Sequence, residues 1–238
     1  MSKIIHLEKV ESTNEYAKKL SPDVPDRTIV VADTQSEGKG RLNREWVSPV
    51  GGLWMTILVR TGHPGSFDSI LTLATGIAVV RTLKDIGLAA SLKWPNDIMV
   101  GRRKLGGILC EWAPETHSIV IGIGLNLNFD IDVLPEELRA SATSSRHELK
   151  RDLSRDEIIA QLSVEFETIY RRFEDGQTEE ILLEWKRLSS MLGREVEVDM
   201  IGQRYEGKAV DIDKDGSLIL RQPSGSDKKI IAGDVTIK

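Results

Sequence analysis

The stretch KLGGILCEWAPETHSIVIGIGLNLN, residues 104–128, decides the fold of this chain. It contains two strand-like runs, at 104–112 and 118–127. Glycines interrupt both runs, and a glycine inside a strand weakens it unless a backbone or a ligand must come close. The alternative for Gly106 and Gly107 is a structural bulge. For the second run, the alternative is a strand packed closely under a helix.

Other elements follow on both sides of this stretch. Apolar runs and helical spacing predict strands and helices elsewhere in the chain. The expected strands are 28–33, 52–60, 91–94 and 97–100, and the expected helices are 12–20, 70–87, 154–173 and 178–192.

The pattern of apolar and charged residues changes after residue 192. Apolar and charged residues alternate in short runs, and Asp215-Gly216 is a strong hairpin signal. We therefore expect a first domain over 1–192 and a small β-barrel over 193–238.

Composition limits the possible classes of protein. The 238 residues are 40% hydrophobic and 29% charged, which is ordinary for a folded domain. A net charge of −5 argues against a nucleic-acid partner. A single cysteine, Cys110, excludes an internal disulfide and a cysteine-rich zinc site. No apolar run suits a signal peptide or a membrane span, so we expect a cytoplasmic protein without a membrane partner.

The segment GKGRLNREW, residues 38–46, is a candidate ligand loop. Its two glycines let the backbone flex and approach a ligand. Lys39, Arg41 and Arg44 suit a phosphate or a carboxylate, although a solvated basic loop would have the same composition. Trp46 closes the loop and is the tryptophan that we expect to contact a ligand.

The segment KWPND, residues 93–97, is a second candidate. It presents the Asn96 amide beside the Asp97 carboxylate, a pair that could orient a cation or bind Mg²⁺. An ordinary Asn-Asp turn is the alternative. Lys104 opens an otherwise apolar strand and supplies a further cation.

Together these segments resemble the biotin protein ligase family. The landmarks occur in the family's order: Ser12-Thr13-Asn14, the 38–46 loop, KWPND, KLGGIL at 104–109, GIGLNLN at 122–128, and Ala142-Thr143-Ser144. Two departures make the loop similar to that of archaeal-type members. Lys39 stands where many bacterial members have arginine, and Leu42-Asn43 stands where they have Arg-Gly. Because Ser12 leaves no room for a preceding helix-turn-helix domain, we expect a minimal ligase without operator binding.

The resemblance implies an α+β fold. We expect a mixed, mostly antiparallel sheet with flanking helices, like the catalytic core of class II aminoacyl-tRNA synthetases, followed by an SH3-like barrel. It also implies a homodimer. In the implied reaction, the biotin carboxylate attacks the α-phosphate of ATP to give biotinyl-5′-AMP. A lysine of a biotin carboxyl carrier protein then takes the biotin.

The resemblance also assigns residues by position. The implied catalytic residues are Arg41, Lys104 and Asp97, with Asp97 also the tentative metal ligand. The implied biotin-binding residues are Ser12, Thr13, Asn14, Gln35, Gly38, Lys39, Gly40, Arg41, Lys104, Gly106 and Gly107. The implied ATP and adenylate residues are Arg41, Arg44, Trp46, Asn96, Lys104 and Asn126. ATP and Mg²⁺ enter as a substrate complex and biotin as a substrate, with no permanently bound cofactor.

Two other functions fit part of this pattern. A lipoate or octanoate ligase would share the fold and the chemistry, and competition between biotin and lipoate would separate the two. A biotin-sensing module without catalysis would bind biotin and release no pyrophosphate. The presence of Lys104, Arg41 and Asp97 argues against this second alternative.

Overall fold

The computed structural model describes residues 3–20, 22–60, 68–200 and 202–238. The chain divides into two compact units, which are described separately below. Unit 1 comprises Met1–Asp68 and Arg102–Ile159, and unit 2 comprises Ser69–Gly101 and Ala160–Lys238. Each unit is therefore built from two separate segments of the chain.

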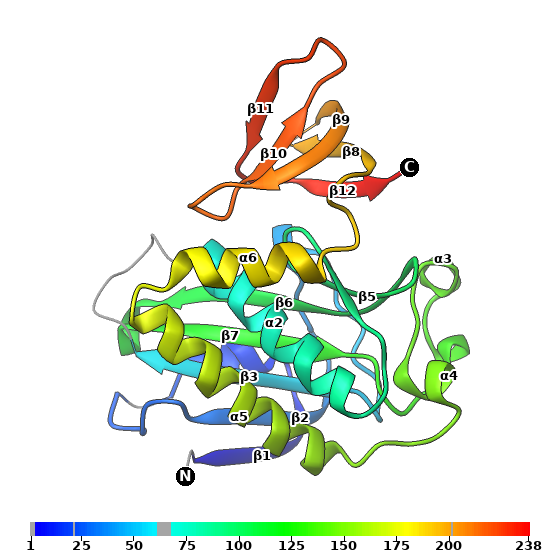
Figure 1. Cartoon of the computed structure of the whole chain (residues 1–238). Helices are drawn as coiled ribbons and strands as arrows, with labels where there is room; N and C mark the ends of the chain where they lie inside the picture. Colours follow the sequence, from blue (N-terminus) through cyan, green and yellow to red (C-terminus); the bar gives the residue numbers. More distant parts are fainter. Residues whose placement is uncertain (1–2, 21, 61–67, 201) are drawn as a thin grey trace. The chain divides into compact units, whose positions relative to one another are not determined.

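A sheet with mainly antiparallel pairing forms the centre of unit 1. Its strands are β1 (Ile4–Val10), β2 (Ile29–Gln35), β3 (Leu53–Arg60), β6 (Arg103–Ala113) and β7 (Ser118–Leu125). They pair in the order β1-β2-β3-β7-β6, and only β1 and β2 run parallel. In Figure 1, β7 lies between β3 and β6, so β3 and β7 are neighbours in the sheet although they are not consecutive strands in the sequence. The expected mixed, mostly antiparallel sheet is confirmed.

Short helices connect these strands in unit 1. They are α1 (Thr13–Lys18), η1 (Arg41–Asn43), η2 (Pro114–Thr116), η3 (Ile131–Val133), α3 (Glu136–Arg139) and α4 (Ser145–Leu149). The helix expected at 12–20 is α1, although the Ser12 side chain makes no capping hydrogen bond to it. Ala17 of α1 packs in a buried cluster with Val30, Ala113 and Val120, which holds the helix against the sheet.

Unit 2 contains the longer helices and a short hairpin. The helices are α2 (Asp68–Asp85) and α5 (Arg155–Glu174), whose first residues belong to unit 1, and α6 (Thr178–Leu188). The hairpin pairs β4 (Ser91–Lys93) with β5 (Asp97–Val100). Arg81 of α2 forms ion pairs with Glu165 of α5 and Glu184 of α6, so one arginine links the three helices.

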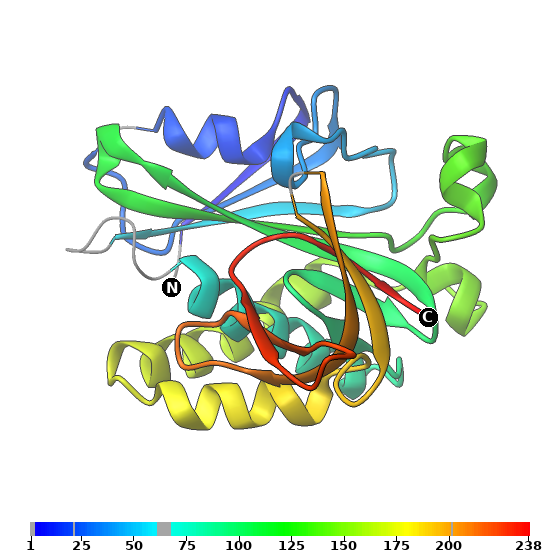
Figure 2. The ribbon, with the colours of Figure 1, turned by 90° about the horizontal axis from the view of Figure 1, so that it is seen from above.

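The last five strands form the C-terminal sheet, also in unit 2. They are β8 (Glu195–Met200), β9 (Gln203–Ile212), β10 (Leu218–Arg221), β11 (Asp227–Ile230) and β12 (Asp234–Ile237). They pair antiparallel in the order β11-β10-β9-β8-β12, and Figure 2 shows the strands curving. The expected hairpin at Asp215-Gly216 joins β9 to β10. Among the strands that the structure describes, β11 is not paired with β12, so the hydrogen bonds do not close a barrel.

Three features differ from the sequence-based expectations. Strand β1 was not expected, because its half-exposed residues give a weak pattern. Helices α3 and α4 are too short to produce a helical period. Helix α6 ends at Leu188 rather than near residue 192. In the described parts of the chain, no helix is both long and apolar enough to cross a membrane.

Candidate active site

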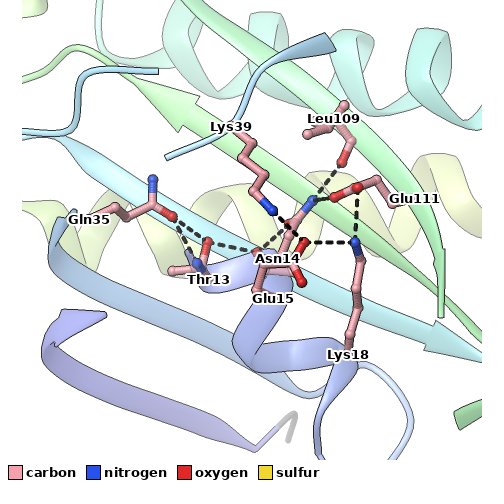
Figure 3. Close-up of polar contacts among 9 residues, drawn as sticks. Thr13, Asn14, Glu15, Lys18, Gln35, Lys39, Leu109 and Glu111 are labelled. Carbon is pink, nitrogen blue, oxygen red and sulfur yellow. Dashed lines mark hydrogen bonds and ion pairs between the residues drawn. The ribbon is translucent and has the colours of Figure 1, made fainter. Parts of the chain in front are cut away.

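Helix α1 presents buried polar side chains to the centre of the unit 1 sheet. Ser12, Thr13 and Asn14 are each at most 4% exposed. Gln35, at the end of β2, accepts two hydrogen bonds through Oε1: one from the backbone N–H of Thr13 at 2.8 Å and one from its hydroxyl at 3.1 Å. Figure 3 shows these contacts. The structure therefore brings together four of the predicted biotin-binding residues, Ser12, Thr13, Asn14 and Gln35.

The other end of the Gln35 amide is also engaged. Its Nε2 donates to the Ser48 hydroxyl at 2.8 Å, and that hydroxyl donates to the Trp46 carbonyl at 3.0 Å. Thr56 lies in the middle of β3, and its buried hydroxyl is 2.8 Å from Thr13 Oγ1. These groups form a polar cluster inside an apolar sheet, where each donor and acceptor requires a partner.

Asn14 uses its side chain to join α1 to β6. Its Nδ2 donates to the Leu109 carbonyl at 3.2 Å and to Glu111 at 2.8 Å, as Figure 3 shows. A Cβ at Gly122 of β7 would lie only 2.5 Å from Asn14 Oδ1. The glycine at position 122 of the GIGLNLN segment is thus explained by helix α1, which packs closely over the strand.

Glu15 links α1 to the 38–46 loop. Its carboxylate lies 3.0 Å from the Lys18 ammonium and 3.2 Å from that of Lys39 (Figure 3). The hydrogen bond from Lys18, reinforced by Lys39 and opposed by partial burial, lowers the pKa of Glu15. Lys18 also pairs with Glu111 at 2.9 Å. Lys39, a predicted ligand-loop residue, is therefore held by α1 through an ion pair.

The 38–46 loop is a compact hairpin. The backbone N–H of Gly40 donates to the Arg44 carbonyl at 2.7 Å, and the N–H of Trp46 donates to the Gly38 carbonyl at 2.8 Å. A Cβ at Gly38 would lie 2.3 Å from the Trp46 carbonyl oxygen, so this close approach requires glycine. At the tip, Leu42 and the following residue have φ angles of 55° and 56°, which are costly for leucine. Arg41 is half-buried, whereas Arg44 is exposed.

Trp46 and Lys104 meet at the base of this loop. The Lys104 ammonium lies 5.2 Å from the centroid of the Trp46 ring, within the range of a cation–π contact. The indole also lies against β7, where a Cβ at Gly124 would be 2.7 Å from Trp46 Nε1. This Nε1 is buried without a hydrogen-bond partner among the described residues. A buried donor without a partner costs about 1–3 kcal/mol, and an acceptor on a ligand would remove that cost.

Asn126 and Gly106, the latter in β6, have structural contacts. The buried Asn126 amide donates through Nδ2 to the Thr143 carbonyl at 3.0 Å. A Cβ at Gly106 would lie 2.4 Å from the carbonyl oxygen of Gly124 on β7. This contact between strands explains Gly106 without a ligand. The biotin contacts of Gly106 and Gly107 and the adenylate contact of Asn126 stay predictions.

In unit 2, the KWPND segment forms the turn of the β4–β5 hairpin. Asp97 pairs with Lys93 at 2.7 Å, and its side chain is 12% exposed. Asn96 precedes it in the same turn. Among the described residues, no group of three or more histidine, cysteine or acidic residues could hold a metal ion. Asp97 is thus a single carboxylate, which fits a Mg²⁺ that arrives on nucleotide phosphates better than an all-protein cage.

Four residues of the site were not expected from the sequence. Thr56, Ser48, Glu15 and Glu111 complete the contacts around α1 and the loop. A usable signal existed for two of them. Thr56 interrupts the apolar run 52–60, and Glu111 interrupts the apolar run 104–112, and buried polar residues in such runs need partners.

Comparisons with known families match both parts of the chain. The model of the "Biotin/lipoate A/B protein ligase family" matches residues 7–127, which are half of the chain. The model of the "Biotin protein ligase C terminal domain" matches residues 191–238. The first match contains α1, the 38–46 loop, the KWPND segment and Lys104.

Individual proteins agree with these matches. The "Bifunctional ligase/repressor BirA" of Bacillus spizizenii is 33% identical over 98% of this chain and 74% of its own length. The "Biotin--[acetyl-CoA-carboxylase] ligase" of Paracoccus denitrificans is 29% identical over 92% of this chain and 94% of its own. The biotin protein ligase of Aquifex aeolicus, solved with biotin and ATP, superposes with a TM-score of 0.87 at 28% identity, covering 100% of this chain and 99% of that one. These matches confirm the resemblance seen in the motifs, and the chain belongs to the biotin/lipoate A/B protein ligase family.

Proposed function

We propose that this chain is a biotin protein ligase that joins biotin to a lysine of a biotin carboxyl carrier protein, through biotinyl-5′-AMP. The similarity to the Aquifex aeolicus enzyme, which was solved with biotin and ATP and aligns over the whole chain, carries this proposal. The contacts in unit 1 between Thr13 and Gln35, and between Trp46 and Lys104, support it. We further propose that the enzyme is cytoplasmic and forms a homodimer.

The cations suit the first half-reaction. Attack of the biotin carboxylate on the α-phosphate of ATP brings two anions together, and fixed positive charges lower the energy of that transition state. Lys104 is positioned over the Trp46 ring, and Arg41 lies half-buried in the adjacent loop. We assign these two residues to the carboxylate and the α-phosphate, and the exposed Arg44 to the remaining phosphates.

The polar cluster at α1 suits the ureido ring of biotin. This ring presents donors and acceptors that must be paired when the ring is buried. Ser12, Thr13 and Gln35 offer hydroxyl and amide groups at the end of β2, among apolar strands. We propose that biotin exchanges for part of the Thr13–Gln35 contact, with Asn14 holding the helix in place.

Trp46 and Asp97 suit the nucleotide. The unpartnered Trp46 N–H can donate to an acceptor nitrogen or oxygen of the adenylate. Asp97 and Asn96 offer oxygens to Mg²⁺ that enters with ATP as the substrate complex. Asp97 also accepts from Lys93, so the carboxylate is held in a defined orientation.

The test is biotin-dependent exchange of pyrophosphate into ATP, with lipoate and acid-free reactions as controls. We expect exchange with biotin alone, because adenylation is reversible before a carrier is present. Exchange with lipoate alone would keep the chemistry and overturn the substrate. Biotin binding without exchange would overturn the enzymatic function and leave a biotin-sensing module.

A further inference from the structure

The KWPND hairpin contacts the C-terminal sheet through the two side chains that precede its proline, Lys93 and Trp94. Lys93 donates to the Val235 carbonyl of β12 at 3.2 Å. The Trp94 indole donates to the Gly216 carbonyl at 2.9 Å, and the Trp94 ring is 2% exposed. All of these residues belong to unit 2. The hairpin that carries Asn96 and Asp97 is therefore built partly on the C-terminal sheet.

Lys93 makes the connection to Asp97 direct. Its ammonium lies 2.7 Å from Asp97 Oδ2 while it donates to Val235. The two residues are also opposite each other in the β4–β5 pairing, so their side chains share one face of the hairpin. An ammonium has three donors and can bridge a carboxylate and a carbonyl at once. Lys93 thus links the Asp97 carboxylate to a backbone oxygen of β12.

The position of that oxygen is fixed by the C-terminal sheet. Val235 pairs with Val198 of β8 in a regular antiparallel register. The Gly216 turn is fixed independently, since a Cβ at Gly216 would lie 3.0 Å from Cβ of Ser69 and 3.3 Å from Cδ1 of Ile70. The C-terminal sheet therefore contacts the hairpin at two places, Val235 and Gly216. Gly216 also lies against helix α2.

We propose that Lys93 is a positioning residue, which couples the C-terminal sheet to Asp97 and so sets how the enzyme uses MgATP. This inference rests on the proposed function, because Asp97 matters only if the chain adenylates an acid. Lys93 does not touch biotin in this assignment. Its effect is confined to the nucleotide side of the reaction, which separates it from the contacts of α1.

The kinetic test compares Lys93→Met with wild type in biotin-dependent pyrophosphate exchange. We expect kcat/KM for MgATP to fall on the order of 10–100-fold, which is the usual effect of removing a group that orients a metal-binding side chain. The KM for biotin should be unchanged. Lys93→Arg should restore most of the loss, because a guanidinium also has several donors. Lys238→Met is the matched control: it removes an exposed lysine of the C-terminal sheet that pairs with Glu206 at 2.6 Å, and we expect no kinetic change.

A second measurement does not depend on activity. Hydrogen exchange should become faster in Lys93→Met both at 96–100 and at 234–237, and in neither segment in Lys238→Met. Faster exchange in only one segment, or unchanged MgATP constants in a folded Lys93→Met protein, would overturn the proposal. If wild type shows no exchange of pyrophosphate, the proposed function fails, and the hydrogen-exchange result still decides whether Lys93 joins the two segments.

Discussion

Lys104 combines two properties at the level of a single side chain. It is the second residue of β6, and its ammonium lies 5.2 Å from the centroid of the Trp46 ring at the end of the 38–46 loop. A cation held in advance stabilises a developing anion without reorganisation during the reaction.

We expect Lys104→Ala to reduce the adenylation rate on the order of 10²–10³-fold, because one preorganised transition-state donor is lost. Single-turnover formation of biotinyl-5′-AMP measures this rate directly. Lys9→Ala, on the exposed edge of β1, is the matched control and should leave the rate unchanged. A loss of less than about threefold in Lys104→Ala would correspond to under ~1 kcal/mol and would contradict the assigned role.

Glu15 gives a pH-dependent prediction. The hydrogen bond from Lys18, together with Lys39, lowers the pKa of folded Glu15 below its ordinary 4.5. An acid with a lowered folded pKa stabilises the protein above its unfolded pKa, and this contribution is lost as the pH falls through the folded pKa. We expect Glu15→Gln to unfold more easily than wild type at neutral pH, with a difference that shrinks below pH 4.5.

Urea unfolding measured from neutral pH down to about pH 3 tests this expectation. Glu8→Gln, an exposed acid on β1, serves as the control and should show no such pH-dependent difference. A stability difference for Glu15→Gln that stayed constant across this range would show that the ion pairs do not stabilise the fold.

At the level of elements, two glycines of adjacent strands have different neighbours. At Gly124, the atom that a new methyl group would meet belongs to the Trp46 side chain, 2.7 Å away. At Gly106, it is a backbone carbonyl oxygen of β7, 2.4 Å away. A side chain in a loop can move, whereas a paired strand cannot move without losing hydrogen bonds.

We therefore expect Gly106→Ala to lower the free energy of unfolding by about 1–3 kcal/mol, as overpacking does. Gly124→Ala should cost less stability but displace Trp46, which changes the tryptophan fluorescence and raises the KM for ATP. Denaturant unfolding and steady-state kinetics of both variants provide the comparison. Equal destabilisation by the two substitutions would show that Trp46 is held as firmly as the strand.

Most elements of the sheet could be predicted from the sequence, because strands such as 52–60 and 118–127 are nearly continuous apolar runs. Strand β1 could not, because its residues are half-exposed and carry a weak alternation. The sequence predicts the motif residues of α1 and the loop and two of their partners, Gln35 and Lys104, but not the partners Thr56, Ser48 and Glu111. The contact of Asn14 with Glu111 joins residues 97 apart in the chain, and no local pattern reveals such a pair.

At the level of the whole molecule, the two compact units are not continuous in sequence. The alternation after residue 192 predicts the C-terminal strands, but it does not reveal that they share a unit with the β4–β5 hairpin. That grouping depends on contacts such as Trp94 with Gly216, which are formed only in the folded chain.

Because the hairpin and the C-terminal strands share a unit, we expect some substitutions in them to have non-additive effects on kcat/KM for MgATP. Gly216 has a φ angle of +83° and lies against Ser69, so Gly216→Val should displace the turn from α2 and weaken the Trp94 contact. Substitutions that disturb one connection usually show an interaction energy, whereas distant independent ones add. We expect the combined effect of Gly216→Val and Lys93→Met on kcat/KM for MgATP to be smaller than the sum of the single effects.

The double-mutant cycle is measured in pyrophosphate exchange with varied MgATP. Replacing Lys93→Met by Lys238→Met in the same cycle gives the control, for which we expect simple additivity. Additive effects of Gly216→Val and Lys93→Met would mean that the Gly216 turn and the Lys93 ammonium influence MgATP use independently of each other.

The hydrogen bond between Trp94 and Gly216 also has a consequence for synthesis of the chain. Its two residues are 122 positions apart. A ribosome that adds about 5–20 residues per second needs roughly 6–24 s to cover that distance. During this interval the nascent hairpin has an indole whose final acceptor has not yet been translated. The contacts of the hairpin that carries Asn96 and Asp97 are therefore completed only after the C-terminal strands have been synthesised.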